Sequence, residues 1–163
     1  MCNSKKEKAC SRLRRAFTLA EILIVLAVMG IVSVLVVFSF STITGREALF
    51  KKTDVVLSLL RSARGFTLSA KDASVYGVHF ESGKAVLFTG STYSADATSN
   101  KVELVSPSVS ISSVSLAGGG SDVVFNQFTG ETAQYGTVTL SLVASSTQKK
   151  TITIFSTGIS ESN

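Results

Sequence analysis

Cysteine is scarce in this chain of 163 residues, and its placement limits the chemistry available. The only two cysteines, Cys2 and Cys10, both lie within the first ten residues. If that N-terminal segment is removed, the remaining protein has neither a free thiol nor a disulfide, which an exported protein can do without. Two cysteines without a nearby histidine form a weak metal site, so we predict no metal and no cofactor.

Histidine occurs once, at His79, which excludes a zinc site rich in imidazole ligands. Because His79 stands between Val78 and Phe80 on an alternating strand, it is expected to face away from the core. One histidine is enough for a serine–histidine–aspartate triad, but no nucleophile-elbow motif accompanies it. We therefore expect a solvated or packed histidine, in a protein that is not an enzyme.

Basic residues outnumber acidic ones, but the excess belongs to one end of the chain. Residues 1–16 hold six of the 16 Lys and Arg residues and one of the 11 Asp and Glu residues. The rest of the chain is therefore balanced, with ten bases and ten acids. No basic domain is present to hold nucleic acid by counterion release, so nucleic acid is an unfavoured partner. Basic residues beside a membrane span stay cytoplasmic, which places the C-terminal part outside.

Charge is absent from Ile22 to Phe38, an apolar run of 17 residues. With its flanks, the segment 17–42 reaches the ~20 residues that cross ~30 Å of hydrocarbon, so we predict a transmembrane segment there. Glu21 is the lone acid at the start of this segment. A central acid costs roughly 2.5–3.5 kcal/mol on insertion scales, so a chain that keeps Glu21 there is expected to use it.

The helix is predicted to continue beyond the membrane. Leu49, Val56, Leu60 and Ala63 recur at steps of 7, 4 and 3, which is typical of the buried face of an amphipathic helix. The segment 17–70 would then be one long helix, with one half in the membrane and the other half packed into a head.

From Ala73 onward, apolar residues recur with a period of two, which indicates strands. A Ser82-Gly83 turn between two such runs predicts a hairpin. The region 71–163 is therefore expected to be an extracytoplasmic head in which an antiparallel sheet packs on the helix, an α+β fold. Further strands are predicted at 102–105, 109–114, 123–125, 137–142 and 151–155, with a turn at 144–148.

The junction Arg15-Ala16-Phe17-Thr18-Leu19-Ala20-Glu21 resembles the processing site of type IV prepilins and type II secretion pseudopilins. Members of that family are cut just before the Phe-Thr-Leu-x-Glu stretch, and the new N-terminal phenylalanine is methylated. The resemblance implies that residues 1–16 are a leader peptide, which a prepilin peptidase removes by cleavage after Ala16. It also implies N-methylation of Phe17. The residue before the cut is usually glycine, and Ala16 departs from that pattern.

Most of the rest of the chain resembles, more loosely, the H-type minor pseudopilins and the FimT-like minor pilins. In that group an amphipathic Leu-Arg-x-Ala-Arg segment leads into a first hairpin, as residues 59–64 and 75–80 do here. Residues 125–130 and 152–158 also match loosely. Major pilins commonly have a proline at the position of Phe38 and a C-terminal disulfide. This chain has neither, which favours a minor subunit.

The resemblance implies a structural subunit of a type II secretion pseudopilus or a type IV pilus. Its partners would be other pilin subunits, the prepilin peptidase and an assembly platform in the inner membrane. The subunit would first be a single-pass protein of the cytoplasmic membrane with its head outside, and later part of a periplasmic or surface filament. Glu21 would then meet the N-terminal amine of Phe17 in a neighbouring subunit.

Two basic pairs in the head admit two interpretations each. Arg61 and Arg64 lie one turn apart, which suits either a solvated helix face or contact with neighbouring subunits or the platform. Lys149 and Lys150 suit either a charge-protected strand edge or, as in some FimT-like pilins, a DNA contact.

Two other functions stay open on the sequence alone. One is a DNA-binding minor pilin for DNA uptake, on the same scaffold. The other is a conventionally secreted or anchored domain, with a cut site at 39–41 after a signal peptide. The apolar run is long for a signal peptide, and it begins beside Glu21. The mature N-terminus distinguishes a pilin from a secreted domain: it would be Phe17 in a pilin, and Thr42 or a nearby residue in a secreted domain.

Overall fold

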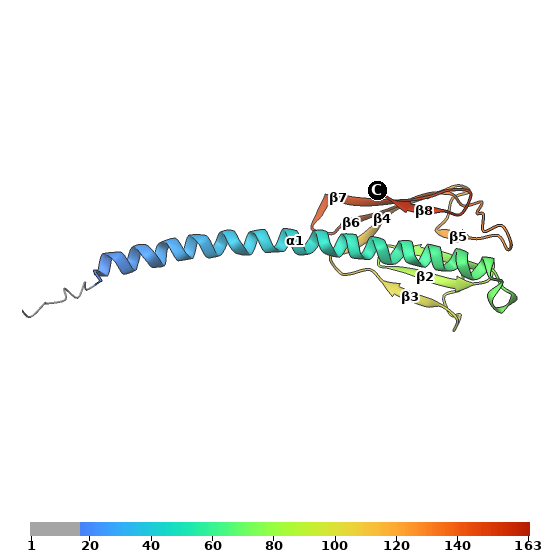
Figure 1. Cartoon of the computed structure of the whole chain (residues 1–163), viewed down its shortest axis with the longest axis horizontal. Helices are drawn as coiled ribbons and strands as arrows, with labels where there is room; N and C mark the ends of the chain where they lie inside the picture. Colours follow the sequence, from blue (N-terminus) through green and yellow to red (C-terminus); the bar gives the residue numbers. More distant parts are fainter. Residues whose placement is uncertain (1–16) are drawn as a thin grey trace, which may run out of the picture. The chain divides into compact units, whose positions relative to one another are not determined.

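The computed structural model describes residues 17–163, with the side chains of residues 37–43 left aside. Helix α1 runs from Leu19 to Leu68, and a short 3-10 helix η1 (Lys71–Ala73) follows it (Figure 1). The chain divides into two compact units between Phe40 and Ser41. The first unit holds the start of α1, and the second holds the rest of α1 and every described strand.

The described part of the first unit is an apolar helix whose side chains are exposed. Leu19–Val36 has a mean hydropathy of 2.8, and none of this window is buried. A helix of that length and composition is able to cross a membrane. The start of the predicted transmembrane segment is therefore helical and unburied.

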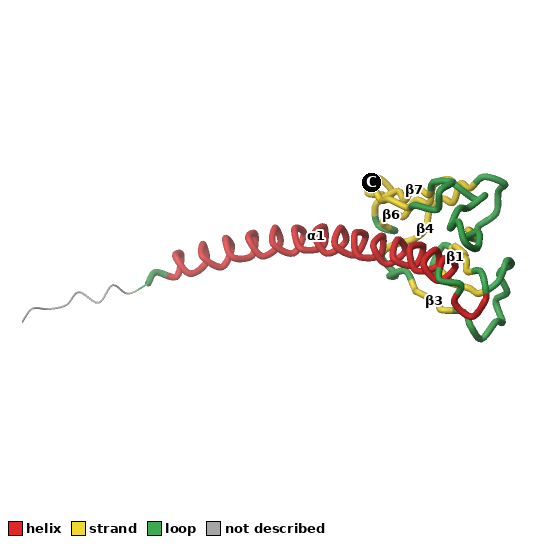
Figure 2. The backbone as a smooth tube through the Cα atoms, turned by 45° about the vertical axis from the view of Figure 1, so that its right-hand side comes forward, coloured by secondary structure: helices red, strands yellow, loops and turns green. Residues whose placement is uncertain are grey.

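The second unit contains two antiparallel sheets of four strands each, packed with α1. In Figures 1 and 2, β6 and β7 lie on one side of α1 and β3 lies on the other. The first sheet has the order β3-β2-β1-β5 and the second the order β4-β6-β7-β8. The strands are β1 (Tyr76–Glu81), β2 (Lys84–Thr89), β3 (Lys101–Leu104), β4 (Val109–Leu116), β5 (Asp122–Val124), β6 (Gly136–Leu142), β7 (Ser145–Ile154) and β8 (Ser160–Ser162).

The buried face of α1 in the head is the one that the helical period predicts. Leu49, Val56, Leu60 and Ala63 are all buried in one hydrophobic core with both sheets. Leu60 and Ala63 have no exposed surface at all. Because this face turns inward, the charged residues between these positions remain in solvent: Glu47, Lys51, Asp54 and Arg61.

The predicted α+β class, with a long helix packed on antiparallel strands, is confirmed. One sheet was expected, and the strands form two. The predicted turn at 144–148 is wrong, because the chain turns at Val143 and Ala144 and β7 already begins at Ser145. Residues 145–150 are polar and lack apolar alternation, yet Ser145, Lys149 and Lys150 pair with β6, with a register shift between them. Strand β8 is equally polar and was not predicted.

Gly77 allows an aromatic layer to form on the outer face of the first sheet. A Cβ at Gly77 would lie 2.5 Å from Cζ of Phe88, so the ring occupies the space that a side chain would fill. Phe88 is buried there, and Tyr93 from the following loop meets it edge-on with ring centroids 5.6 Å apart. The polar loop predicted at 91–100 thus covers this face of the sheet instead of standing free.

Candidate functional site: the N-terminal processing and assembly segment

The first turn of α1 is capped by Thr18. Its hydroxyl Oγ1 accepts a hydrogen bond of 3.2 Å from the backbone N–H of Glu21. Its carbonyl oxygen accepts bonds from the N–H groups of Glu21 and Ile22, at 3.1 and 3.3 Å. The spacing Thr-x-x-Glu is that of a capping box, in which the hydroxyl satisfies one of the free N–H groups at a helix start. Thr18 was not among the residues predicted from the sequence, although the Thr-x-x-Glu spacing is a recognisable signal of such a cap.

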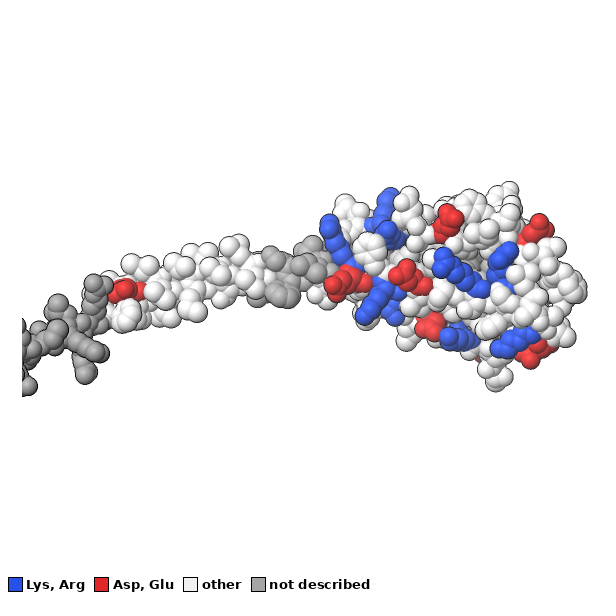
Figure 3. Space-filling model, viewed as in Figure 1, with Lys and Arg blue, Asp and Glu red and all other residues white. Residues whose placement is uncertain are grey.

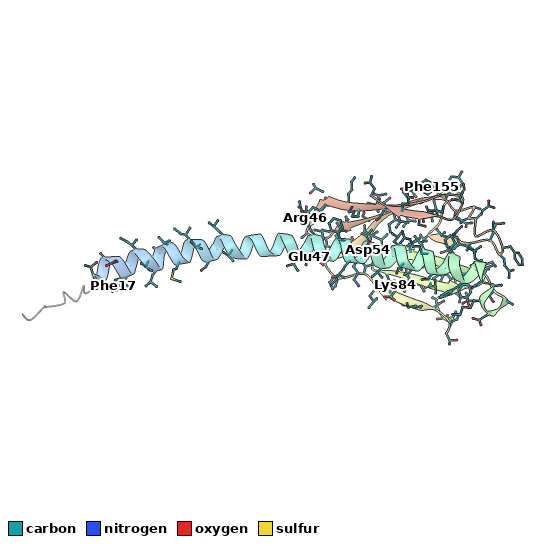
Figure 4. The ribbon with its side chains drawn as sticks, viewed as in Figure 1. Phe17, Arg46, Glu47, Asp54, Lys84 and Phe155 are labelled. Atoms are coloured by element: carbon teal, nitrogen blue, oxygen red, sulfur yellow. The ribbon has the colours of Figure 1, made fainter. Side chains whose placement is uncertain are left out.

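Phe17 directly precedes the cap and lies outside the helix, which begins at Leu19 (Figure 4). Its side chain is 75 % exposed. Ala16, on the other side of the predicted cleavage site, lies outside the described residues. The assignments of cleavage to Ala16 and Phe17 and of methylation to Phe17 stay predictions.

Glu21 lies in the first turn of α1 and is exposed. A carboxylate there is favoured by the partial positive charge of the helix N-terminus, which is typically worth 0.3–1 kcal/mol at an exposed site. Glu21 is also the only charged residue between Leu19 and Val36, and Figure 3 shows this stretch as white apart from one acidic side chain near its start. The helix dipole would offset only part of the cost of a carboxylate in an apolar environment.

The apolar side chains of the segment that contains Glu21 are exposed. Leu19 is 78 % exposed and Ile31 65 % exposed, and the rest of the window is similar. A continuous apolar surface of this kind marks a lipid-facing or partner-facing helix. Ser33 is compatible with either, because its hydroxyl donates a 2.7 Å hydrogen bond to the carbonyl of Met29 and is therefore satisfied within the helix.

The other residues singled out in the sequence lie in the head. His79 faces away from the core, as expected, but Tyr93 covers it: the two rings stack with centroids 3.9 Å apart. Its Nδ1 contacts the carboxylate of Asp122, and its Nε2 lies 3.4 Å from Oε1 of Glu81. The same Oε1 of Glu81 also forms an ion pair with Lys84, whose Nζ lies 3.2 Å away. The histidine is thus engaged in a polar network with neighbouring strands.

Metal ligands do not come together in the described part of the chain. Within residues 17–163, no three His, Cys, Asp or Glu side chains are placed to hold a metal ion. Cys2 and Cys10 lie outside those residues.

One family model matches the chain. The prokaryotic N-terminal methylation motif matches residues 11–37, a range that contains the cap, Phe17 and Glu21. No curated protein and no solved structure matches the chain. The motif supports a type IV pilin-like family and indicates a prepilin-type precursor of a pilus or pseudopilus subunit.

Such a precursor is cleaved by a peptidase and assembles with other pilin subunits. The motif and the single apolar N-terminal helix are consistent with a membrane-anchored, single-pass protein.

Proposed function

We propose that the chain is a structural minor subunit of a type II secretion pseudopilus or a type IV pilus, of the H-type or FimT-like kind, and not an enzyme. The observation that carries the proposal is the placement of Glu21. It is the one carboxylate in the exposed apolar stretch Leu19–Val36, and it lies within the methylation motif that covers residues 11–37. A helix of this kind needs lipid at first and other helices later, which is what a filament subunit requires.

The geometry at the start of α1 is compatible with the proposed processing. Because Thr18 caps the helix, Phe17 lies on non-helical chain and its peptide bond to Ala16 precedes the first turn. A peptidase binds an extended substrate more readily than a helical one. Because the predicted cut after Ala16 precedes the first turn, cleavage would leave α1 intact. The product is a free amine on Phe17, which the same enzyme would methylate.

In the filament, the carboxylate of Glu21 would pair with the Phe17 amine of a neighbouring copy. Each charge is costly when it is buried alone among apolar helices, and the pair lowers that cost for both. Removal of one partner leaves the other unpaired, which is typically worth 3–5 kcal/mol in a buried pair. Assembly is then favoured for processed subunits only, because an uncleaved chain has no amine at Phe17.

The minor-subunit assignment has support in the order of elements. The Leu-Arg-x-Ala-Arg segment lies in α1, and the chain then passes through the short η1 into the β1–β2 hairpin, in the order that the subgroup's pattern expects. Before assembly, the subunit would be held in the cytoplasmic membrane with its head outside, in reach of the assembly platform.

Mass spectrometry of the mature N-terminus tests the proposal. Protein from cells with the prepilin peptidase should begin at a methylated Phe17, and protein from cells without it should keep residues 1–16. A mature protein that begins at Thr42 or nearby would instead establish a conventionally secreted domain. An unprocessed chain in cells that make such filaments would overturn the proposal.

A further inference from the structure

A half-open cavity of about 300 Å³ lies between α1 and β7 in the head. Three of its lining side chains are cationic, and none is acidic. We call it the basic groove, and it is lined by Arg46, Leu49 and Phe50 of α1 and by Thr147, Gln148, Lys149 and Lys150 of β7. Figure 3 shows basic side chains at this end of the head, with acidic side chains beside them.

Specific contacts join the two walls of the basic groove. Arg46 donates a hydrogen bond of 3.2 Å from Nε to Oε1 of Gln148. The Nζ of Lys150 lies 4.7 Å from the centroid of the Phe50 ring, a cation–π contact on a ring that is still 52 % exposed. Residues that are 102 positions apart are thereby held together in one positively charged site.

Within the described residues 17–163, no carboxylate pairs with the cations of the basic groove. Among residues 17–163, no ion pair engages Arg46, Lys149 or Lys150. In Figure 4, Arg46 lies on the β7 side of α1, and the neighbouring Glu47 lies on the other side. An anion that enters the basic groove would therefore meet cations without displacing an internal carboxylate.

The strand beside the groove is only partly paired. Strand β8 pairs with Ile152–Ile154 of β7, and Thr151 exchanges backbone hydrogen bonds with Asn163. Of the preceding residues, Lys149 and Lys150 pair with β6, and the register then shifts before Ser145. Residues 147–150 have no partner in β8, and they line the basic groove together with Arg46 and Phe50.

The basic groove begins where the uncharged run of the chain ends. Uncharged residues run from Ile22 to Gly45, which is 24 residues. At 1.5 Å per residue a helix of that length rises ~36 Å, more than the ~30 Å of hydrocarbon and less than the ~40–45 Å of the whole bilayer. Arg46 is the first charge after this run, and Phe50 follows four residues later, so a run that spans the membrane would bring Arg46 to the headgroup layer.

We propose that the basic groove binds the phosphate headgroup of an anionic phospholipid in the outer leaflet, while the subunit waits in the membrane before assembly. Arg46 would hold the phosphate through its guanidinium fork, and Lys149 and Lys150 would add positive charge beside it. Phe50 is an aromatic side chain of the kind that prefers the membrane interface. The inference rests on the proposed single-pass topology, and it assigns the head a preferred orientation at the bilayer surface.

A tryptophan reporter tests this binding. The chain has no tryptophan, so Phe50→Trp provides a unique fluorescence signal and keeps an aromatic ring beneath Lys150. The full chain carrying this reporter would be reconstituted into vesicles of phosphatidylcholine alone or with phosphatidylglycerol. We expect a blue shift and stronger quenching by headgroup-labelled lipid in the anionic vesicles, and a decline of both as salt is raised.

Charge variants in the same background locate the effect. Lys149→Gln with Lys150→Gln should remove at least half of the difference between anionic and neutral vesicles, and Lys149→Arg with Lys150→Arg should keep it. The matched control is Lys71→Gln. It removes the same charge from a second cation–π pair among residues 17–163, in which Nζ of Lys71 in η1 lies 4.2 Å from the centroid of the Phe66 ring of α1. It should leave the difference unchanged.

Three outcomes would overturn the proposal. The first is an emission that does not depend on phosphatidylglycerol, and the second is an equal loss in the Lys71→Gln control. The third is an equal response to a DNA oligonucleotide added to neutral vesicles, which would make the groove a nucleic-acid site. Flotation of the same vesicles after an alkaline wash reports insertion of the span separately. Loss of insertion counts against the proposed topology, whereas an inserted chain without a lipid effect counts against the groove alone.

Discussion

Arg64 donates a hydrogen bond of 3.1 Å from its Nε to the carbonyl oxygen of Gly130, and so joins α1 to the turn between β5 and β6. Two glycine turns meet at this point. Gly130 has a φ of +66° and Gly158 a φ of +77°, and a Cβ at Gly158 would lie 1.9 Å from the same carbonyl oxygen. Only a residue without a side chain fits there. Arg64 is therefore engaged within the chain, whereas Arg61, one turn earlier, is exposed.

Arg64→Leu should destabilise the head, because it leaves the Gly130 carbonyl without this donor. A hydrogen bond to a charged group is typically worth 1.5–3 kcal/mol, and the half-buried position of Arg64 favours the lower end, about 1.5 kcal/mol. Urea unfolding of the full chain in detergent, followed by circular dichroism, measures the change. Arg61→Leu is the matched control and should stay within about 0.5 kcal/mol of the wild type. Equal effects of the two variants would contradict a special role for Arg64.

Tyr76→Phe should change how stability depends on alkaline pH. Burial raises the pKa of Tyr76 above its ordinary value of 10.0, and the hydrogen bond of 2.9 Å to Asp72 and the charge of that carboxylate add to the rise. The unfolded chain then loses the tyrosine proton first as the pH rises. The contribution of the neutral Tyr76 side chain to the free energy of unfolding is therefore complete below about pH 10, and it is lost as the pH rises above that value.

The free energy of unfolding, measured at intervals from about pH 8 to pH 11, should fall less steeply for Tyr76→Phe than for the wild type. At neutral pH the variant should be less stable by about 0.5–1.5 kcal/mol, because the bond to Asp72 is lost. An identical alkaline decline in both proteins would assign that decline to other groups.

Tyr93→Ala should release the loop between β2 and β3 from the first sheet. Tyr93 stacks on His79 and meets Phe88 edge-on, so it fastens the loop through two ring contacts. Aromatic pairs of this kind are worth about 0.5–1.5 kcal/mol each beyond the area they bury. Hydrogen exchange of residues 90–100 should accelerate, while the amides of β6 keep their protection.

Tyr93→Phe is the control for this change, since it keeps both rings in contact and removes only the hydroxyl. Its exchange pattern should match that of the wild type. Unchanged protection of the loop in Tyr93→Ala would show that other contacts hold it in place.

Glu21→Ala should separate membrane insertion from filament assembly. The variant removes the only charge from Leu19–Val36, so insertion should be at least as favourable as before. Incorporation into filaments should fall at least tenfold, because the Phe17 amine of the neighbour would be buried without a partner. Quantitative immunoblots of sheared filaments and of membranes measure the two fractions.

Glu47→Ala is the matched control, because Glu47 is an exposed acid on the same helix beyond the apolar segment. It should leave both fractions unchanged. Normal incorporation of Glu21→Ala would end the assembly role assigned to this residue.

Sequence alone was enough to predict the features that depend on neighbouring residues. The apolar run, the buried face of Leu49, Val56, Leu60 and Ala63, and the β1–β2 hairpin each follow from a local period or a turn signal. The candidate site is local too: the motif around Phe17 and Glu21 lies within one segment, and even the missed Thr18 cap has a short sequence signature.

Only the tertiary structure decided which distant residues meet. Arg64 and Gly130 are 66 positions apart, His79 and Asp122 are 43 apart, and Arg46 and Gln148 are 102 apart. The polar parts of β7 and β8 likewise pair through backbone groups that every residue carries, so no side-chain pattern predicts these strands. Periodic burial marks the inward face of each element, but the choice of neighbour depends on how those faces pack together in one core. That choice brings together, in one groove, an exposed ring and three cations that form no ion pair within residues 17–163.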